Sequence, residues 1–231
     1  MILNGELLSK IEFAKDEVIA AGRYLARRQY HVALGGNVSA RVAEGVLVCT
    51  RHGADKESLT SDDLVVCDLS GRKLDGVGEP TSEFSMHRVS YAARPEVRGV
   101  IHAHPPTATA FAATSVPLDQ LQLPEMLVLL GPVALAPYAT PGSELLADNL
   151  APFLPGHDAF LLENHGALTL GRTVRQAALR MDLLEFCARI SLMTRQLGRA
   201  FKLAAADRET LMTFREPMAH WGCEAFAEHE R

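Results

Sequence analysis

The stretch VRGVIHAHPPTATAFAAT, residues 97–114, passes from apolar residues to two histidines and then to two prolines. Its first part, up to His104, predicts a β-strand, and the prolines predict the start of a helix because proline fits the first helical turn. Residues i and i+2 of a strand face the same side, so His102 and His104 should project together. The segment therefore predicts a strand that ends in a pair of neighbouring histidines and leads into a helix.

The rest of the chain alternates between helical and strand patterns. Ser9 and Glu12 form a capping-box pattern, which predicts that the first helix begins at Ser9. Helices are predicted at 9–29, 82–94, 105–114, 143–154 and 173–198. Strands are predicted at 45–50, 64–69, 97–104 and 133–138, in a short run after the turn at 70–73, and twice within 158–171, where Asn164-His165-Gly166 separates them. This order predicts a mixed α/β fold with helices on both faces of a sheet.

Length and composition limit the classes of protein. The 231 residues show no internal repeat or flexible linker, so we expect one domain over 1–231. The net charge of −5 and the lack of a long basic block argue against nucleic acid as a partner. No apolar run approaches the ~18 residues of a membrane span, and the N-terminus does not resemble a signal peptide. With four scattered cysteines, these features predict a cytoplasmic protein without a membrane partner.

A third histidine, His165, stands at the predicted break between two apolar strands. Together with His102 and His104, it would give a metal ion three imidazole ligands. Three neutral imidazoles leave a zinc-like ion with its full charge and an open position, as a catalytic site requires. The alternative is that all three are hydrogen-bonded core histidines or surface residues, because short motifs often occur by chance.

Three further segments carry polar groups in Gly-containing or helix-starting turns. These are LGGNVSAR (34–41), CTRHGADK (49–56) and EPTSE (79–83). Each of the first two is by itself an ordinary turn next to a strand. In the third, Thr81 and Ser82 stand where hydroxyl groups and free amides form an anion site at a helix N-terminus. Glu83 is then either a functional carboxylate or a residue that the helix dipole favours in the first turn.

In this order, the segments GGNVSAR, TRHGADKESLT, EPTSE, VIHAHPPTATAF, APYATPGSELL and LLENHGAL resemble the class II aldolase/adducin family over about residues 8–200. Within this family, the segments resemble those of the L-fuculose-1-phosphate aldolases. The resemblance implies a three-layer α/β/α sandwich with a mainly antiparallel central sheet. It also implies a cyclic homotetramer with active sites between subunits, and residues 200–231 would form a C-terminal tail near the subunit interface.

The resemblance assigns roles to individual residues. His102, His104 and His165 match the metal ligands, and Glu83 matches the catalytic carboxylate. The residues that match the cradle for the substrate phosphate are Gly36, Asn37, His52, Gly53, Thr81 and Ser82. The implied cofactor is one divalent metal ion per subunit, expected to be Zn²⁺, with Mn²⁺ and Co²⁺ as alternatives.

The implied reaction is reversible cleavage of a ketose 1-phosphate to dihydroxyacetone phosphate and an aldehyde. The metal would polarise the substrate carbonyl, and Glu83 would exchange the proton at C3. Candidate substrates are 5-methylthioribulose 1-phosphate, 5-deoxyribulose 1-phosphate and fuculose 1-phosphate. Epimerases of the family carry aspartate at position 83, and decarboxylases carry lysine at position 82, where this chain has serine. A dehydratase of the same family stays open, as does a non-catalytic adducin-like protein-binding module.

One departure from the aldolase pattern concerns the group that handles the C4 hydroxyl. Fuculose-type enzymes use tyrosines near the C-terminus and in the segment that matches 123–131, whereas the last tyrosine here is Tyr138. Glu125 stands nearest the second of these positions. In the tail, Met218, Trp221 and Phe226 either line a pocket for a less polar aldehyde, form an exposed docking surface, or only pack against the rest of the chain.

Overall fold

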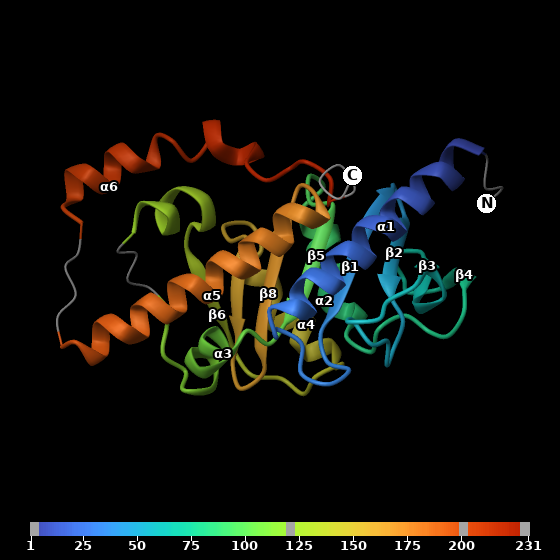
Figure 1. Cartoon of the computed structure of the whole chain (residues 1–231), viewed down its shortest axis with the longest axis horizontal. Coiled ribbons are helices and arrows are strands. Elements are labelled where there is room, and N and C mark those ends of the chain that lie inside the picture. The colour runs from blue at the N-terminus through green and yellow to red at the C-terminus, as the bar shows by residue number, and fades with distance from the viewer. Residues whose placement is uncertain (1–4, 119–122, 199–202, 227–231) are drawn as a thin grey trace.

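The computed structural model describes residues 5–118, 123–198 and 203–226. Its centre is an eight-stranded sheet with the order β4-β3-β2-β1-β5-β8-β7-β6 (Figure 1). Neighbouring strands are antiparallel except β6 and β7, which are parallel. The predicted mixed α/β class with a mainly antiparallel sheet is therefore confirmed.

The described strands except β1 lie where the sequence predicts them, and several are shorter by one or two residues at an end. The strands are β1 (Asn37–Ala43), β2 (Val46–Thr50), β3 (Leu64–Cys67), β4 (Lys73–Gly76), β5 (Gly99–Ala103), β6 (Val133–Ala136), β7 (Ala159–Leu162) and β8 (Gly166–Gly171). β1 begins inside the glycine-containing segment 34–41, at Asn37. This central strand lies between β2 and β5, so the segment is more than a turn.

The helices are α1 (Gly5–Arg27), α2 (Phe84–Ala93), α3 (Pro106–Ala113), α4 (Glu144–Leu150), α5 (Val174–Gln196) and α6 (Ala205–Met212). Short helical turns also occur at Ser61–Asp63, Met126–Leu130, Ala151–Phe153 and Pro217–His220. Within the described ranges, no helix combines the length and the apolar character needed to cross a membrane.

Two predicted helix starts are wrong. The helix predicted from Ser9 already includes Gly5, and the Ser9 hydroxyl donates to the Gly5 carbonyl at 3.1 Å. Serine can make this hydrogen bond inside a helix, so the capping-box pattern at Ser9 and Glu12 does not mark the start of α1. The helix predicted from residue 82 begins at Phe84, because Ser82 and Glu83 form a turn before it.

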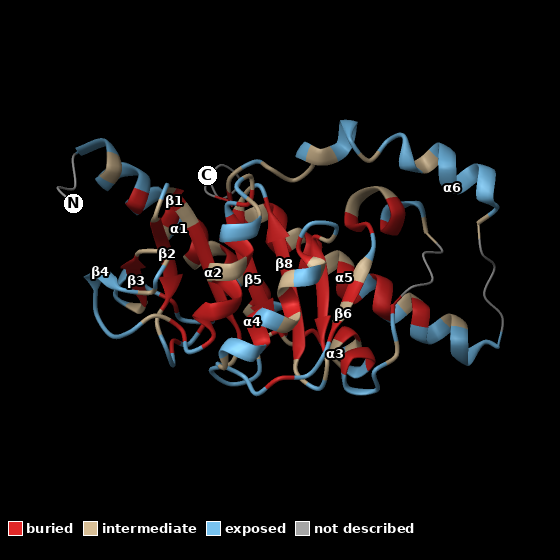
Figure 2. Ribbon diagram, turned by 180° about the vertical axis from the view of Figure 1, so that it is seen from behind, coloured by how far each residue is buried: buried red, intermediate tan, exposed pale blue. Residues whose placement is uncertain are grey.

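Apolar residues pack on both faces of the sheet, and most of the sheet is coloured as buried in Figure 2. Successive residues of a strand alternate between two separate clusters: Leu161 packs with residues of α1, α3 and α5, whereas Phe160 packs with residues of α2 and α4. His102 lies on β5 two residues after Val100, which belongs to the cluster with α2 and α4. The histidine pair therefore faces the α2 side of the sheet.

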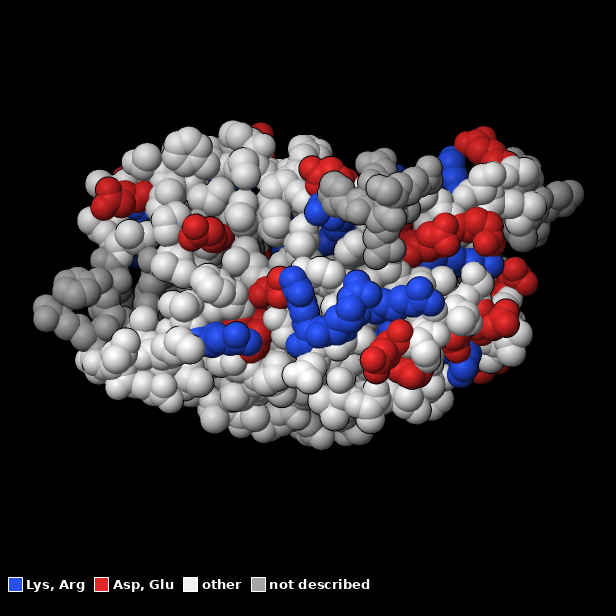
Figure 3. Space-filling view, in the orientation of Figure 1, with Lys and Arg blue, Asp and Glu red and all other residues white. Residues whose placement is uncertain are grey.

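The C-terminal segment returns along α5 (Figure 1). The Gln176 amide on α5 donates to the carbonyl oxygens of Ala219 and Trp221 at 3.0 and 2.8 Å. The Trp221 indole N–H donates to the carbonyl of Leu129 at 3.3 Å. On the face seen in Figure 3, Lys and Arg side chains lie in a band with Asp and Glu beside it, so charges of both signs are interspersed there.

Candidate active site

Three adjacent strands of the sheet bring the candidate site together. Asn37 at the start of β1 is the cross-strand partner of His102 on β5, and His104 follows just after β5 ends. β8 lies on the other side of β5, and His165 stands in the turn that joins β7 to β8. That turn is tight, since Asn164 has a φ of 52° in the left-handed region. Residues far apart in sequence therefore meet at one end of the sheet.

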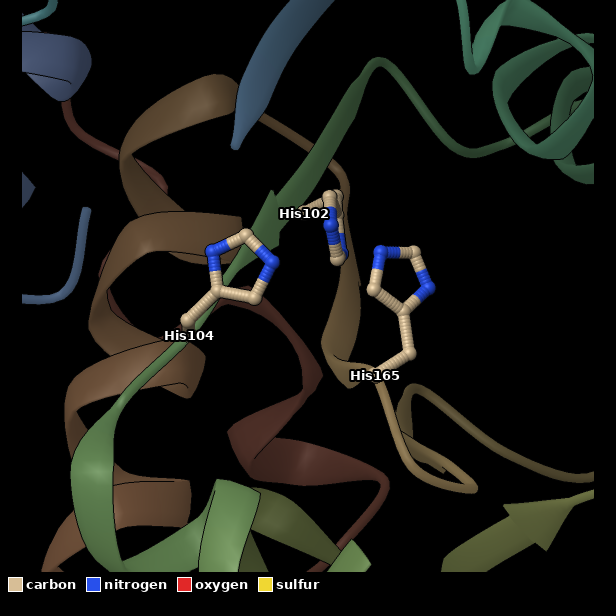
Figure 4. A group of neighbouring side chains, drawn as sticks. All are labelled: His102, His104 and His165. Atoms are coloured by element: carbon tan, nitrogen blue, oxygen red, sulfur yellow. The ribbon is translucent and has the colours of Figure 1, made fainter. Parts of the chain in front are cut away.

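The three predicted ligand histidines converge (Figure 4). One ligand nitrogen from each residue lies within 4.8 Å of the other two. His102 Nδ1 donates to the Ala167 carbonyl at 2.9 Å, which leaves Nε2 with a free lone pair. His102 Nε2 and the Nδ1 atoms of His104 and His165 are buried without a hydrogen-bond partner. Unpartnered buried polar atoms are costly, and a metal ion is the partner that three converging imidazoles fit.

Burial also sets the protonation of His102 and His104. It lowers the pKa of His102 to about 3, and it lowers the pKa of His104 as well. Both rings are therefore neutral near pH 7, which is the form that binds a metal ion. The residues present fit a divalent metal site.

Glu83 lies beside this cluster. Its Oε2 accepts a hydrogen bond from the Asn37 amide at 2.9 Å and lies 3.3 Å from His102 Nε2, while its Oε1 lies 3.1 Å from His165 Nε2. Burial acts to raise the Glu83 pKa, but the contacts with His165, His102 and Asn37 outweigh it and hold the pKa below its usual range. Although Glu83 precedes α2, its side chain makes no capping hydrogen bond. Its contacts are with the histidines and Asn37 rather than with the helix end.

The residues matched to a phosphate cradle lie in two neighbouring places. Near Glu83 are Asn37 and Thr81, whose hydroxyl accepts from the Glu83 backbone N–H at 3.4 Å. His52 and Gly53 form a separate exposed turn, which the His52 N–H joins to the Glu79 carbonyl at 2.9 Å. Ser82 is exposed and follows Thr81 in the sequence.

Gly36 lies where the backbone passes close to the histidine cluster. It has a φ of 74°, and a Cβ there would lie 2.9 Å from the His102 carbonyl oxygen and 2.3 Å from His31 Nδ1. Only glycine fits this position without a shift of its neighbours.

Two residues near the site were not predicted. The buried Lys56 ammonium donates to the carbonyl oxygens of Leu34 and Ala54, so it joins the loop before β1 to the turn after β2. Burial lowers its pKa to about 8. His31 is the second residue, and both of its ring nitrogens are buried without a hydrogen-bond partner. Lys56 stands in the segment TRHGADKESLT, but nothing in the sequence signals its burial.

Within one chain, the tail residues Met218, Trp221 and Phe226 lie away from the histidine cluster. Met218 and Trp221 line a cavity of about 360 Å³ with Asp158, Arg180 and Arg215, and the described residues that line it include none of the three histidines. Phe226 packs its ring against another aromatic side chain, at a centroid distance of 5.6 Å. A single chain therefore does not bring these tail side chains to the histidine cluster.

Comparison with known families identifies the class of protein. Residues 16–192 match the family described as Class II Aldolase and Adducin N-terminal domain. The chain belongs to this family, and the resemblance seen in the sequence is confirmed. It is an enzyme of the class II aldolase type, which is a metal-dependent class, and its three clustered histidines could bind a metal ion.

Several individual proteins are similar to this chain. The chain is 33% identical over 181 residues to an L-fuculose phosphate aldolase of Methanococcus maripaludis, covering 78% of this chain and 97% of the relative. It is 28% identical to a 5-deoxy-D-ribulose 1-phosphate aldolase of Bacillus thuringiensis, covering 85% and 92%. A solved L-fuculose 1-phosphate aldolase superposes with a TM-score of 0.80 at 30% identity, covering 87% and 94%. Other relatives are named as a methylthioribulose-1-phosphate dehydratase and a 3-oxo-tetronate 4-phosphate decarboxylase.

Proposed function

We propose that the protein is a zinc-dependent aldolase that reversibly cleaves a ketose 1-phosphate to dihydroxyacetone phosphate and an aldehyde. The observation that supports this most is the placement of Glu83, whose two carboxylate oxygens lie 3.3 and 3.1 Å from the ring nitrogens of His102 and His165. A carboxylate held against a set of metal-ligating histidines is suited to move a proton on a substrate that the metal has made acidic.

In this proposal, His102, His104 and His165 hold the metal ion. When bound, the ion supplies Lewis-acid polarisation of the C2 carbonyl of the substrate. The C3–C4 bond breaks as a base accepts the proton of the C4 hydroxyl, and C4 becomes the aldehyde carbon. The candidates for this base are Glu125 and a residue of the C-terminal tail. The base releases its proton to solvent, from which Glu83 takes one up. Glu83 then delivers a proton to C3 of the three-carbon fragment, and in the direction of synthesis it removes that proton.

The substrate phosphate would be bound by the remaining matched residues: Gly36, Asn37, His52, Gly53, Thr81 and Ser82. Backbone amides in such turns can bind a phosphate without direct contact from a lysine. Lys56 has a supporting role in this proposal, because its ammonium group holds two of the loops together. Its charge, buried beneath them, also favours an anion.

The part of the site that recognises the aldehyde would come from a neighbouring subunit. We propose a cytoplasmic homotetramer with active sites between subunits and the segment 200–231 close to the interface. Support comes from Met218 and Trp221, which line a different cavity within their own chain. The three-layer α/β/α arrangement belongs to the same proposal, and the separate apolar clusters on the two faces of the sheet support it.

The substrate is proposed to be a 5-deoxy- or 5-methylthio-pentulose 1-phosphate. The lack of tyrosine after Tyr138 supports this choice over fuculose 1-phosphate, as does the apolar character of the tail. A dehydratase is the second candidate, because it would use the same metal ligands and because one relative carries that name. Mn²⁺ and Co²⁺ stay as alternatives to Zn²⁺.

The test compares kcat/KM for fuculose, 5-deoxyribulose and 5-methylthioribulose 1-phosphates, with release of dihydroxyacetone phosphate as the signal. We expect cleavage of the two pentulose phosphates to match or exceed that of fuculose 1-phosphate. A preference of several orders of magnitude for fuculose 1-phosphate would refute the substrate proposal. Loss of water from 5-methylthioribulose 1-phosphate, without release of dihydroxyacetone phosphate, would show the dehydratase instead.

A further inference from the structure

A chain of buried hydrogen bonds runs from Glu83 into the protein, away from the histidine cluster. The Asn37 amide nitrogen donates to Glu83 Oε2 at 2.9 Å, and Asn37 Oδ1 lies 2.6 Å from His87 Nε2. His87 Nδ1 lies 2.6 Å from the Ser39 hydroxyl, which lies 2.9 Å from the hydroxyl of Tyr91. We call Asn37, His87, Ser39 and Tyr91 the Glu83 relay.

The relay joins one face of a helix to one face of a strand. Glu83, His87 and Tyr91 are spaced four residues apart at the start of and along α2, so they lie on one side of the helix. Asn37 and Ser39 are two residues apart on β1 and face the same side of the sheet. Residues of β1 and residues of α2 therefore alternate along the relay.

The direction of each hydrogen bond follows from the first. Because the Asn37 NH₂ group donates to the carboxylate, its carbonyl oxygen must accept, and His87 Nε2 must carry the proton. His87 Nδ1 is then an acceptor, so Ser39 donates to it, and Tyr91 donates to Ser39. Every donor in the relay points towards Glu83, an arrangement in which each bond strengthens the next.

Burial keeps the relay in this state. Ser39 and His87 are fully buried, and Tyr91 is 2% exposed. Burial lowers the pKa of His87 to about 4, and it raises the pKa of the Tyr91 hydroxyl. Near pH 7 the imidazole is therefore neutral and the phenol keeps its proton, which are the forms that the relay requires.

We propose that His87, Ser39 and Tyr91 are positioning residues, which act through Asn37 to hold Glu83 in the orientation that transfers the substrate proton. This inference rests on the proposed function. An asparagine amide can turn over and present its oxygen instead of its nitrogen. The N–H of His87 can donate only to the oxygen of the Asn37 amide, so it fixes the amide nitrogen towards Glu83 Oε2. The other oxygen, Oε1, is left without a well-aligned hydrogen-bond donor and faces His165.

The experiment compares Ser39→Ala and Tyr91→Phe with two matched controls. Ser90 is also fully buried on α2, but its hydroxyl donates to the Met86 carbonyl at 2.7 Å and takes no part in the relay. Tyr24 has its hydroxyl bonded to Asp182 at 3.1 Å on the other side of the sheet. Each variant is measured for metal content, melting temperature, and exchange of the C3 proton of dihydroxyacetone phosphate in D₂O.

We expect Ser39→Ala to lower kcat for this exchange about 5- to 10-fold, the equivalent of one buried hydrogen bond. Tyr91→Phe, one bond further from Glu83, should lower it less. KM and metal content should stay at wild-type values, and Ser90→Ala and Tyr24→Phe should exchange at the wild-type rate. A split between kcat and KM separates positioning from a merely structural role, which would lower melting temperature in relay and control variants alike.

The tautomer of His87 gives a readout that does not depend on activity. Long-range ¹H–¹⁵N correlation of the wild-type enzyme, with His87→Gln to assign the ring, should show a neutral imidazole with the proton on Nε2. A proton on Nδ1, or Ser39→Ala exchange no slower than that of Ser90→Ala, would overturn the relay. A wild-type enzyme that exchanges no C3 proton would instead refute the proposed function, whatever the tautomer.

Discussion

Two buried carboxylates, Glu83 and Asp158, have opposite surroundings. Asp158 is 9% exposed and is contacted by three arginines: Arg94 and Arg180 at 3.0 Å each and Arg215 at 3.7 Å. Glu83 is 8% exposed, but its hydrogen bond comes from the neutral Asn37 amide, and its other neighbours are imidazoles. Both side chains avoid water to the same degree, and only the chemistry of their partners differs.

We propose that this difference separates a structural carboxylate from a reactive one. The guanidinium groups around Asp158 stay charged, so that carboxylate is locked into ion pairs that join α5, the segment after α2 and the tail. Glu83 has only neutral donors and a group of histidines with unpartnered nitrogens beside it. The proposed role of Glu83 is therefore proton transfer, whereas Asp158 serves as the counter-ion of the three arginines.

The largest effect is expected when one of the histidines beside Glu83 is replaced. His102→Ala or His165→Ala should reduce metal content from about one ion per chain to near zero and abolish cleavage, because two imidazoles hold zinc far more weakly than three. Elemental analysis of the purified variants measures this. The matched control is exposed His220, which lies outside the cluster. Full metal occupancy in either ligand variant would contradict the assigned site.

The next effect is on turnover at Glu83 itself. Glu83→Gln keeps the size and polarity of the side chain but removes the base, so kcat for cleavage should fall ~10²–10⁴-fold. Metal content and melting temperature should stay near wild type, because the side chain does not cap α2. Steady-state kinetics and a thermal melt of the same sample test this. A lower melting temperature with unchanged kcat would show that Glu83 stabilises the fold and does not transfer the proton.

Asp158→Asn should give the reverse result. Removing the charge leaves the buried Arg180 and its neighbours without their counter-ion, which typically costs about 3–5 kcal/mol of unfolding free energy. The histidine cluster does not use this side chain, so kcat of the folded enzyme should change little. Urea unfolding followed by circular dichroism gives the free energy. An unfolding free energy of Asp158→Asn equal to that of the wild type would show that Asp158 is not a structural carboxylate.

A smaller effect is expected from pH. Because burial lowers the His87 pKa from 6.5 to about 4, the unfolded chain binds a proton at this residue in a pH range where the folded chain does not. Stability that is fully present above about pH 6.5 should therefore be lost progressively as the pH falls towards 4. Unfolding free energies at about pH 7 and about pH 5 measure this loss. His87→Gln should show a smaller loss than wild type, and an equal loss would mean that His87 already titrates normally in the folded protein.

The sequence predicted the histidine cluster because local rules govern it. Strand periodicity sets His102 and His104 on one side, and the Asn-His-Gly break between apolar runs places His165 at a strand end. The structure agrees with both, and it adds that β5 and β8 are neighbours in the sheet. Sheet order depends on contacts between distant segments, which periodicity does not reveal.

The same reason explains what sequence reasoning missed. The bond between Asn37 and Glu83 requires β1 to lie under the start of α2, and no local pattern contains that information. The burial of Lys56 likewise follows from two loops that meet only in the folded chain. The wrong start of the first helix has a local cause, since Ser9 satisfies its hydroxyl inside the helix instead of at its end.

The central claim, that Glu83 transfers the substrate proton, is tested most directly by hydrogen exchange at C3 of dihydroxyacetone phosphate. The enzyme is incubated with this product in D₂O, and loss of the C3 proton signal is followed by NMR. We expect the wild type to exchange one of the two C3 protons, and Glu83→Gln to exchange it ~10²–10⁴-fold more slowly with metal content unchanged. Exchange by Glu83→Gln at the wild-type rate would show that another group moves the proton.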